Sequence, residues 1–182
     1  AGIVSLTTLQ QFNLLQTEEA QAMVMSWCHC QSWAADVVKH RPYSDAQQLS
    51  DYCEMRWQLA TPAEVEAALA AHPLIGDVEL LRAKFAPGDE QASTAMSEQG
   101  QVLQASGATL DELARLNVAY KQRHGFIFVI CAKHLSAEVM LAAIRDRIGN
   151  STNDELTCAA AEQRKIFLPV SYTHLRAHET SL

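Results

Sequence analysis

The residues best suited to proton transfer in this chain surround His72. Pro73 disfavours the α region for the residue before it, so we expect the imidazole on an extended turn that follows a helix. Gly76, shortly afterwards, permits the close approach of another group. A histidine on a rigid turn of a helical scaffold can act as a general acid or base. The alternative is a structural histidine, which is the commoner role of a lone imidazole.

A carboxylate and a carboxamide lie side by side further along the chain, at Glu98 and Gln99. We predict a helix over residues 92–105 that carries both, and a solvent-exposed helix face is the competing interpretation of Glu98. The Gln99 carboxamide is both a donor and an acceptor, which suits a ligand rich in ureido and amide edges.

The Cys28-His29-Cys30 stretch resembles a metal or redox cluster at first sight. Residues two apart do not share a helix face, and no second Cys/His pair lies at zinc spacing. We therefore expect these side chains to pack in the interior, and we predict no metal site.

Two further histidines, His124 and His134, flank an apolar run at residues 126–131. Each also fits a cation at a helix end. One short apolar run cannot build a sheet, so we expect residues 126–131 to form a buried extended connection between helices. The tryptophans, which no basic residues interleave, are expected in the core: Trp27, Trp33 and Trp57.

Composition excludes several classes of protein. A chain of 182 residues with 48% hydrophobic and 19% charged residues fits one globular domain. A net charge of -7 without a dense basic run speaks against nucleic acid and membrane surfaces as partners. No window approaches the roughly 18 apolar residues of a membrane span, and the first residues lack a secretory pattern. The five cysteines have no repeated spacing, so a reducing compartment, by default the cytoplasm, is expected.

Helices separated by Pro and Gly must position these residues, which predicts an all-α, single-domain bundle of about seven to nine helices. Thr61 and Glu64 form a capping box, with Pro62 at the first helical position. We expect a second capping box at Thr109, after Gly107 has closed the preceding helix. The predicted helices lie near residues 6–12, 17–41 with a break before Trp33, 45–59, 61–71, 92–105, 109–125, 136–148 and from 153 onward, with a further turn or two at 78–85.

Caps and inward faces follow from the same pattern. Ser136 and Asn153 are the expected caps of the last two helices. Residues 169–182 break the apolar period and resemble a vector-encoded read-through, so we predict a domain over residues 1–168 and a non-native tail over 169–182. The expected inward residues are Ala22 and Met25, then Leu110, Leu113, Leu116, Asn117 and Tyr120, and finally Leu156, Ala159, Ala160 and Ile166.

Taken in order, several short motifs resemble the 2-oxo-4-hydroxy-4-carboxy-5-ureidoimidazoline (OHCU) decarboxylase family. Each alone is weak, whereas their order over residues 6–167 is specific. They are His72-Pro73-x-Ile75-Gly76, Glu98-Gln99, Leu116-Asn117-x-x-Tyr120, Gly125-Phe126-x-Phe128-Val129, Arg147-Ile148 and Asn153-x-Glu155-Leu156, together with the Cys28 to Trp33 stretch and Arg41-Pro42-Tyr43 upstream.

The resemblance implies a cofactor-free carboxy-lyase of urate catabolism that converts OHCU into (S)-allantoin and carbon dioxide, and a homodimer. It makes His72 the proton donor that sets the configuration of the product. It makes Glu98 the group that holds the substrate hydroxyl and Gln99 the group that reads the ureido moiety. The other substrate-contacting positions that it implies are Pro73, Ala95, Met96, Ser97, Ile130, Cys131, Ala132, Lys133 and His134.

Two departures from the family pattern bear on activity. Ala95 stands where the family usually has serine. The family continues Lys-Ile-x-x-Arg-Leu near its C-terminus, with the arginine facing the substrate, whereas Lys165 and Ile166 lead here to Pro169 and Val170. We therefore expect impaired turnover.

Two other functions remain open from the sequence. One is a helical ligand-binding protein that keeps this fold without turnover. The other, a more distant alternative, is a metal-dependent hydrolase, for which His72, His124 and His134 are the ligands to consider.

Overall fold

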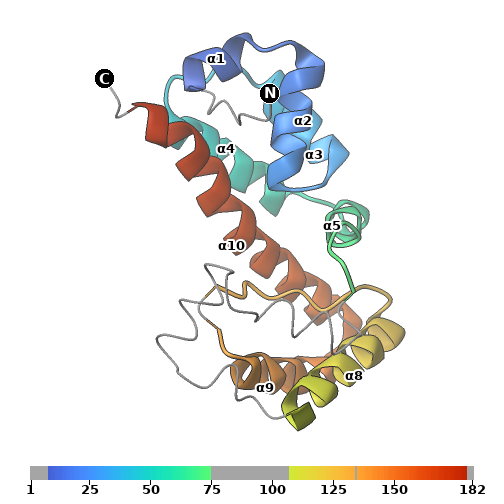
Figure 1. Cartoon of the computed structure of the whole chain (residues 1–182). Helices are drawn as coiled ribbons and strands as arrows, with labels where there is room; N and C mark the ends of the chain where they lie inside the picture. Colours follow the sequence, from blue (N-terminus) through green and yellow to red (C-terminus); the bar gives the residue numbers. More distant parts are fainter. Residues whose placement is uncertain (1–7, 75–106, 134, 180–182) are drawn as a thin grey trace. The chain divides into compact units, whose positions relative to one another are not determined.

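The structure, a computed structural model, describes residues 8–74, 107–133 and 135–179, with side chains as far as Leu168 (Figure 1). This part of the chain contains eight helices and no strand, which confirms the all-α prediction. The predicted helices at residues 78–85 and 92–105 lie outside it. The helices are α1 (Leu9–Leu14), α2 (Thr17–Trp27), α3 (Gln31–Lys39), α4 (Ala46–Gln58), α5 (Pro62–Leu69), α8 (Gly107–His124), α9 (Ala137–Ile148) and α10 (Thr152–Glu179).

The chain forms two compact units. The first comprises Ala1–Ala71 and Ala160–Leu182, and the second comprises His72–Ala159. The boundary between the units therefore falls inside α10.

The core of the first unit is built around aromatic rings from distant parts of the sequence. Helix α3 packs against both α2 and α4. The Trp33 ring, fully buried, lies 5.1 Å from the Phe167 ring, and Trp57 meets the same phenylalanine edge-on at 5.8 Å. Each indole N–H donates to a main-chain carbonyl, Trp33 to Cys53 at 3.0 Å and Trp57 to Ala160 at 2.9 Å. The prediction that the tryptophans are core residues is confirmed.

Arg41, part of the Arg-Pro-Tyr motif, ties the first helices together. Its Nη1 donates to the carbonyls of Phe12 and Leu15 at 2.7 and 2.9 Å, and its Nε donates to that of Val38 at 2.9 Å. These acceptors lie at the C-terminal ends of α1 and α3, where helices leave carbonyls without helical partners. The guanidinium of Arg41 thus has a structural role.

The Cys28-His29-Cys30 stretch connects α2 to α3 and is extended at both cysteines. The expectation that it lies on one helix is wrong, but the expectation that the thiols pack is confirmed: Cys28 is 2% and Cys30 is 1% exposed. Burial, with the neighbouring Cys30 thiol, raises the pKa of Cys28 to about 12. A thiol that stays protonated at neutral pH is a poor nucleophile and a poor metal ligand.

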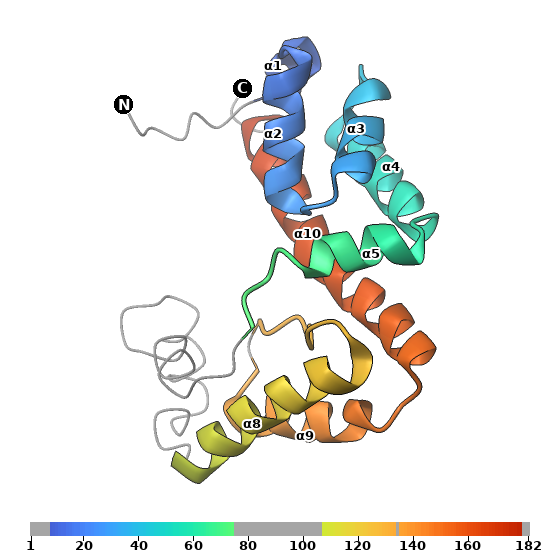
Figure 2. The ribbon, with the colours of Figure 1, turned by 90° about the vertical axis from the view of Figure 1, so that its right-hand side faces the viewer.

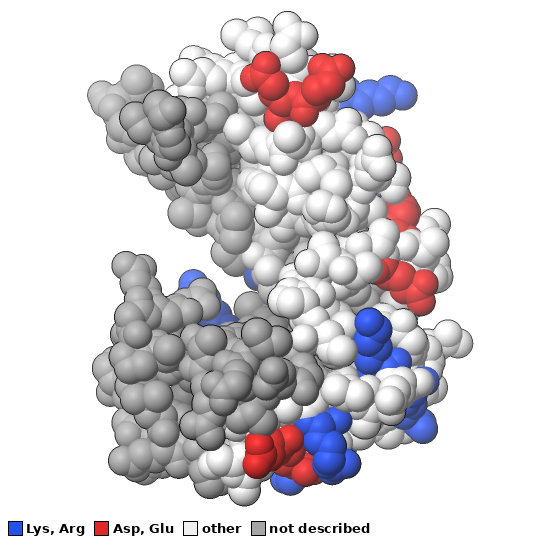
Figure 3. All heavy atoms as spheres, turned by 45° about the vertical axis from the view of Figure 1, so that its right-hand side comes forward, with Lys and Arg blue, Asp and Glu red and all other residues white. Residues whose placement is uncertain are grey.

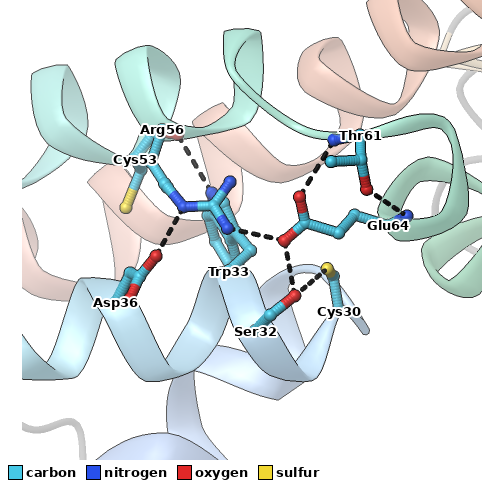
Figure 4. Close-up of polar contacts among 8 residues, drawn as sticks. All are labelled: Cys30, Ser32, Trp33, Asp36, Cys53, Arg56, Thr61 and Glu64. Carbon is cyan, nitrogen blue, oxygen red and sulfur yellow. Dashed lines mark hydrogen bonds and ion pairs between the residues drawn. The ribbon is translucent and has the colours of Figure 1, made fainter.

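A network of charged and polar groups fixes the beginning of α5 against α3 and α4 (Figure 4). The Glu64 Oε2 atom accepts from Arg56 Nη2 at 2.5 Å and from Ser32 Oγ at 2.5 Å, while its Oε1 accepts from the Thr61 N–H at 2.9 Å. Arg56 also donates to Asp36 at 2.7 Å. The predicted capping box is confirmed, and these hydrogen bonds, that from Arg56 above all, lower the pKa of Glu64 to about 2.

Changing Glu64 to glutamine is expected to lower the free energy of unfolding by about 1–3 kcal/mol, since one charge-assisted pair and its partners are lost. Because the folded-state pKa of Glu64 is lowered from 4.5 to about 2, its contribution is complete above pH 4.5 and is lost as the pH falls toward 2. Urea unfolding at pH 7, 4 and 3 measures both effects. The control is Glu66→Gln, exposed on the same helix, which should leave the pH dependence unchanged.

The second unit packs α8 against α9 (Figure 2). The inward face predicted for α8 is confirmed, because Leu110, Leu113 and Tyr120 are buried, as are Leu116 and Asn117. Gly125 ends α8 with a φ of +82°, a backbone conformation that favours glycine. The chain then continues outside helix and strand, with buried side chains at residues 126–129, so the burial expected for this connection is confirmed.

Three details of the helices differ from the predictions. Helix α8 begins at Gly107, so Thr109 is a helical residue and not a cap. The cap of α10 is Ser151, whose Oγ accepts from the Asp154 N–H at 3.1 Å, and not Asn153. In α2 the buried residues are Ala20, Val24 and Trp27, whereas Ala22 is exposed and Met25 half-buried.

These differences have a common physical reason, since contacts elsewhere in the fold outweigh local preferences. Helix α2 has two apolar stripes, and the burial of the large Trp27 indole determines which of them faces the core. In α10, the start at Thr152 turns Glu155 inward, and the fully buried positions recur every fourth residue. Leu156, Ala160 and Ile166, predicted to face inward, are only half-buried, whereas Ala159 is buried.

Among the described residues, the charged side chains on one face of the molecule form no large patch of a single sign (Figure 3). On the face drawn in Figure 3, basic and acidic side chains lie in small groups among uncharged ones. None of the described helices has the length and apolarity that crossing a bilayer requires.

Candidate functional site

His72 lies where the structure leaves α5. The Ala70 N–H donates to the carbonyls of Glu66 and Ala68, and the helix ends there. His72 is half-buried and Pro73 is exposed on the non-helical segment that follows. The predicted turn is thus confirmed, with α5 ending at Leu69, slightly earlier than expected.

The predicted contact residues at 130–133 lie directly after the buried connection, in the same compact unit as His72. Ile130, Cys131 and Ala132 are half-buried, and Lys133 is exposed. The Leu135 N–H donates to the Ala132 carbonyl at 3.1 Å, which closes a turn before α9. The other predicted site residues lie outside the described part of the chain: Ala95, Met96, Ser97, Glu98, Gln99 and His134.

A cluster of buried polar side chains contacts the chain at Phe128 and Val129, directly before this segment. Glu155 is fully buried at the start of α10, and its Oε1 accepts from Tyr120 Oη at 2.6 Å and from Arg147 Nε at 2.9 Å. Its Oε2 accepts from Asn150 Nδ2 at 2.9 Å. Arg147 also donates from Nη1 to the Val129 carbonyl at 3.0 Å, and its guanidinium lies 4.5 Å above the centre of the Phe128 ring.

The electrostatics of the cluster keep Glu155 ionised. Burial alone raises the pKa of Glu155, but the hydrogen bonds from Tyr120, Asn150 and Arg147 outweigh it, so the pKa is lowered. Burial and the hydrogen bond to Glu155 raise the pKa of Tyr120, which therefore stays a donor. The sequence pattern predicted Tyr120 on an inward helix face, and the family motifs include Arg147 and Glu155, but neither gave any of these residues a functional role. The signal in the sequence was the presence of charged residues, Arg147 and Glu155, near the end of α9 and the start of α10.

His124 serves the packing of the second unit. Its ring is buried at the end of α8, with Nε2 3.1 Å from the Ile148 carbonyl and Nδ1 2.9 Å from Thr152 Oγ1. A neutral ring that donates from Nε2 and accepts at Nδ1 satisfies both contacts. Both nitrogens are thus occupied, and no group of three His, Cys, Asp or Glu side chains in the described ranges is arranged to hold a metal ion.

The described part of the protein is all-α, and its candidate acid–base group, His72, lies on the turn that follows α5. A family model described as OHCU decarboxylase matches residues 13–168. This chain belongs to the OHCU decarboxylase family.

Relatives in other organisms agree with this assignment. The OHCU decarboxylase of Amia calva is 32% identical over 142 residues, which are 75% of this chain and 76% of that protein. The OHCU decarboxylase of Haloferax volcanii is 27% identical over 161 residues, 87% of this chain and 90% of that protein. The uric acid degradation bifunctional protein of Arabidopsis thaliana is 39% identical over 100 residues, and the match spans only 30% of its length.

Solved structures show the same fold. A crystal structure of OHCU decarboxylase in the presence of (S)-allantoin has 28% identity and a TM-score of 0.65, and covers 86% of this chain and 96% of that one. A crystal structure of (S)-allantoin synthase has 17% identity and a TM-score of 0.67, covering 93% of this chain and 54% of that one. The second likeness concerns the fold alone.

Proposed function

We propose that this chain decarboxylates OHCU to (S)-allantoin and carbon dioxide in urate degradation, without a cofactor. The observation that carries the proposal is the half-buried His72 on the turn after α5, within the region that the family model matches. A half-buried imidazole on the turn that ends a helix can meet a small substrate and exchange a proton with it.

The reaction requires little beyond orientation and one proton. The substrate carries its hydroxyl and carboxylate on one ring carbon and its ureido group on the next. When the bond to the carboxylate breaks, carbon dioxide leaves and its bonding pair forms a double bond between the two ring carbons. The ring nitrogen of the adjacent C=N bond takes up a proton at the same time, which gives a neutral enol. A proton delivered to the ureido-bearing carbon, with loss of the enol proton, gives the ketone of allantoin. His72 is proposed to deliver that proton to one face only.

The remaining roles follow the family. Glu98 is proposed to hold the substrate hydroxyl and Gln99 to read the ureido group, with Ala95, Met96 and Ser97 beside them. Pro73 and the segment 130–134 complete the proposed site, the latter through backbone groups that match amide edges. A homodimer in the cytoplasm is also proposed, and the absence of a disulfide among the cysteines, all of them free, supports a reducing compartment.

The test is to generate OHCU in situ from urate, with urate oxidase and hydroxyisourate hydrolase, and to follow the circular dichroism of the allantoin formed. The expected result is that this protein forms the S enantiomer faster than spontaneous decay does, although more slowly than with the family's arginine at position 169. Racemic product at the rate of spontaneous decay, both from this protein and after that arginine is restored, would overturn catalysis and favour the ligand-binding alternative.

The C-terminal departure is tested in the same assay. Pro169 lies within α10, and the double change Pro169→Arg with Val170→Leu restores the residues that the family has there. We expect kcat/KM to rise by about 10-fold or more, since one charge-assisted contact to substrate is worth that much. The control Pro169→Ala with Val170→Leu removes the proline without adding the guanidinium. An equal gain in both variants would show that the helix and not the arginine was at fault.

A further inference from the structure

Arg147 links two parts of the second unit that have different tasks. On one side it pairs with the buried Glu155, from Nε to Oε1 at 2.9 Å. On the other side it donates from Nη1 to the Val129 carbonyl at 3.0 Å and stacks over the Phe128 ring. Val129 is the last buried residue before Ile130, where the proposed substrate-contacting segment begins.

The Glu155 end of this link is rigid. The carboxylate accepts hydrogen bonds from α8 through Tyr120, from α9 through Arg147 and from the turn after α9 through Asn150. With α10 itself, three helices therefore meet at one carboxylate. A guanidinium held at that point transfers the fixed geometry of the helices to the main chain at Val129.

We propose that Arg147 is a positioning residue, which orients the backbone of residues 130–133 so that their N–H and C=O groups meet the substrate. The inference rests on the proposed function and deepens it. A segment outside helices and strands depends on anchors of this kind to fix its peptide planes. Backbone groups that read an amide or ureido edge need those planes aligned, and small misplacements weaken binding.

The chemistry of arginine suits this task. Its planar fork donates along fixed directions, here to a carboxylate and to a carbonyl while one face stacks on Phe128. A lysine ammonium is a point charge that can neutralise Glu155 but cannot reproduce both directed hydrogen bonds and the stack. One donor, Arg147 Nη2, is buried and has no hydrogen-bond partner among the residues described. Arg147 thus keeps its hydrogen bonds to Glu155 and to Val129, although its Nη2 group makes none with the residues described.

The test is Arg147→Lys. We expect the KM for OHCU and the dissociation constant for (S)-allantoin, measured by calorimetry, to rise about 10- to 100-fold, the usual effect of losing a residue that orients ligand-contacting groups. We expect kcat to change much less, because His72 is untouched. The control is Arg145→Lys, exposed on the same helix, which should match the wild type in all three quantities.

A second variant tests the positioning role of Arg147 separately from any loss of protein stability. Arg147→Met with Glu155→Gln replaces the buried charges by neutral groups, while the new carboxamide can still accept from Tyr120. We expect a folded protein with near wild-type melting temperature and the same weakened binding. Wild-type KM and (S)-allantoin affinity in either folded variant would overturn the positioning role. Failure of the proposed function differs from this, because the unmodified protein would then neither bind (S)-allantoin nor turn over OHCU.

Discussion

Substitution of His72 by alanine is expected to lower kcat for (S)-allantoin formation by about 10²- to 10⁴-fold, the usual contribution of a general acid. Without a proton donor on one face, the enol is protonated from solvent on either face, so the enantiomeric excess of the product should disappear as well. Circular dichroism of the product and stopped-flow decay of OHCU measure the two effects. His72→Gln, which retains hydrogen bonding but cannot donate a proton at neutral pH, should behave like alanine.

The matched control for His72 is His29→Ala, an exposed imidazole in the first unit. It should retain wild-type rate and stereochemistry. All variants should keep the wild-type melting temperature, since His72 is only half-buried. If His72→Ala still produced the S enantiomer at the wild-type rate, the proton donor would have to be another residue.

The largest expected loss of stability follows from Glu155→Ala. The change leaves the Arg147 guanidinium, whose side chain is 11% exposed, without its carboxylate. Removing one partner of a buried ion pair costs about 3–5 kcal/mol in the free energy of unfolding. Urea unfolding followed by far-ultraviolet circular dichroism measures this loss. Tyr120→Phe removes one neutral donor only and should cost about 1–2 kcal/mol.

The same carboxylate predicts a dependence on pH. Because the pKa of Glu155 is lowered in the fold, its contribution is complete above the ordinary value of 4.5 and is lost as the pH falls below it. The wild type should therefore lose stability more steeply below pH 4.5 than Glu155→Ala does. Glu112→Gln, which breaks a surface pair with Arg115, should have little effect on either measurement. A loss as large for Glu112 as for Glu155 would contradict the importance of burial.

The sequence predicted those elements of the fold whose boundaries depend on local chemistry. The capping box at Thr61, the cap at Ser136 and the turn at Gly125 are where their side chains or backbone preferences require them. Where two local solutions compete, long-range contacts decide, as at the start of α10 and on the buried face of α2.

The features of the candidate site likewise fall into those that the local sequence determines and those that depend on long-range contacts. The turn at His72 was predictable because Pro73 restricts the backbone before it. The family motifs contain Arg147 and Glu155. The pairing of these residues with Val129 and Tyr120 was not predictable, since nothing in the local sequence joins Val129 to α9 or Tyr120 to α10. Such pairings depend on which helix faces meet, and this is decided by the packing of the whole unit.

The division of the first unit between both ends of the chain affects how the protein is made. Phe167 packs against Trp33 and Trp57, more than a hundred residues earlier in the sequence. On the ribosome, the helices of residues 8–69 therefore emerge long before the ring that completes their core. The second unit, His72–Ala159, is continuous and can close in between. Until α10 has left the exit tunnel, the core of the amino-terminal helices lacks the Phe167 ring. The apolar surface that this ring covers is then accessible to chaperones.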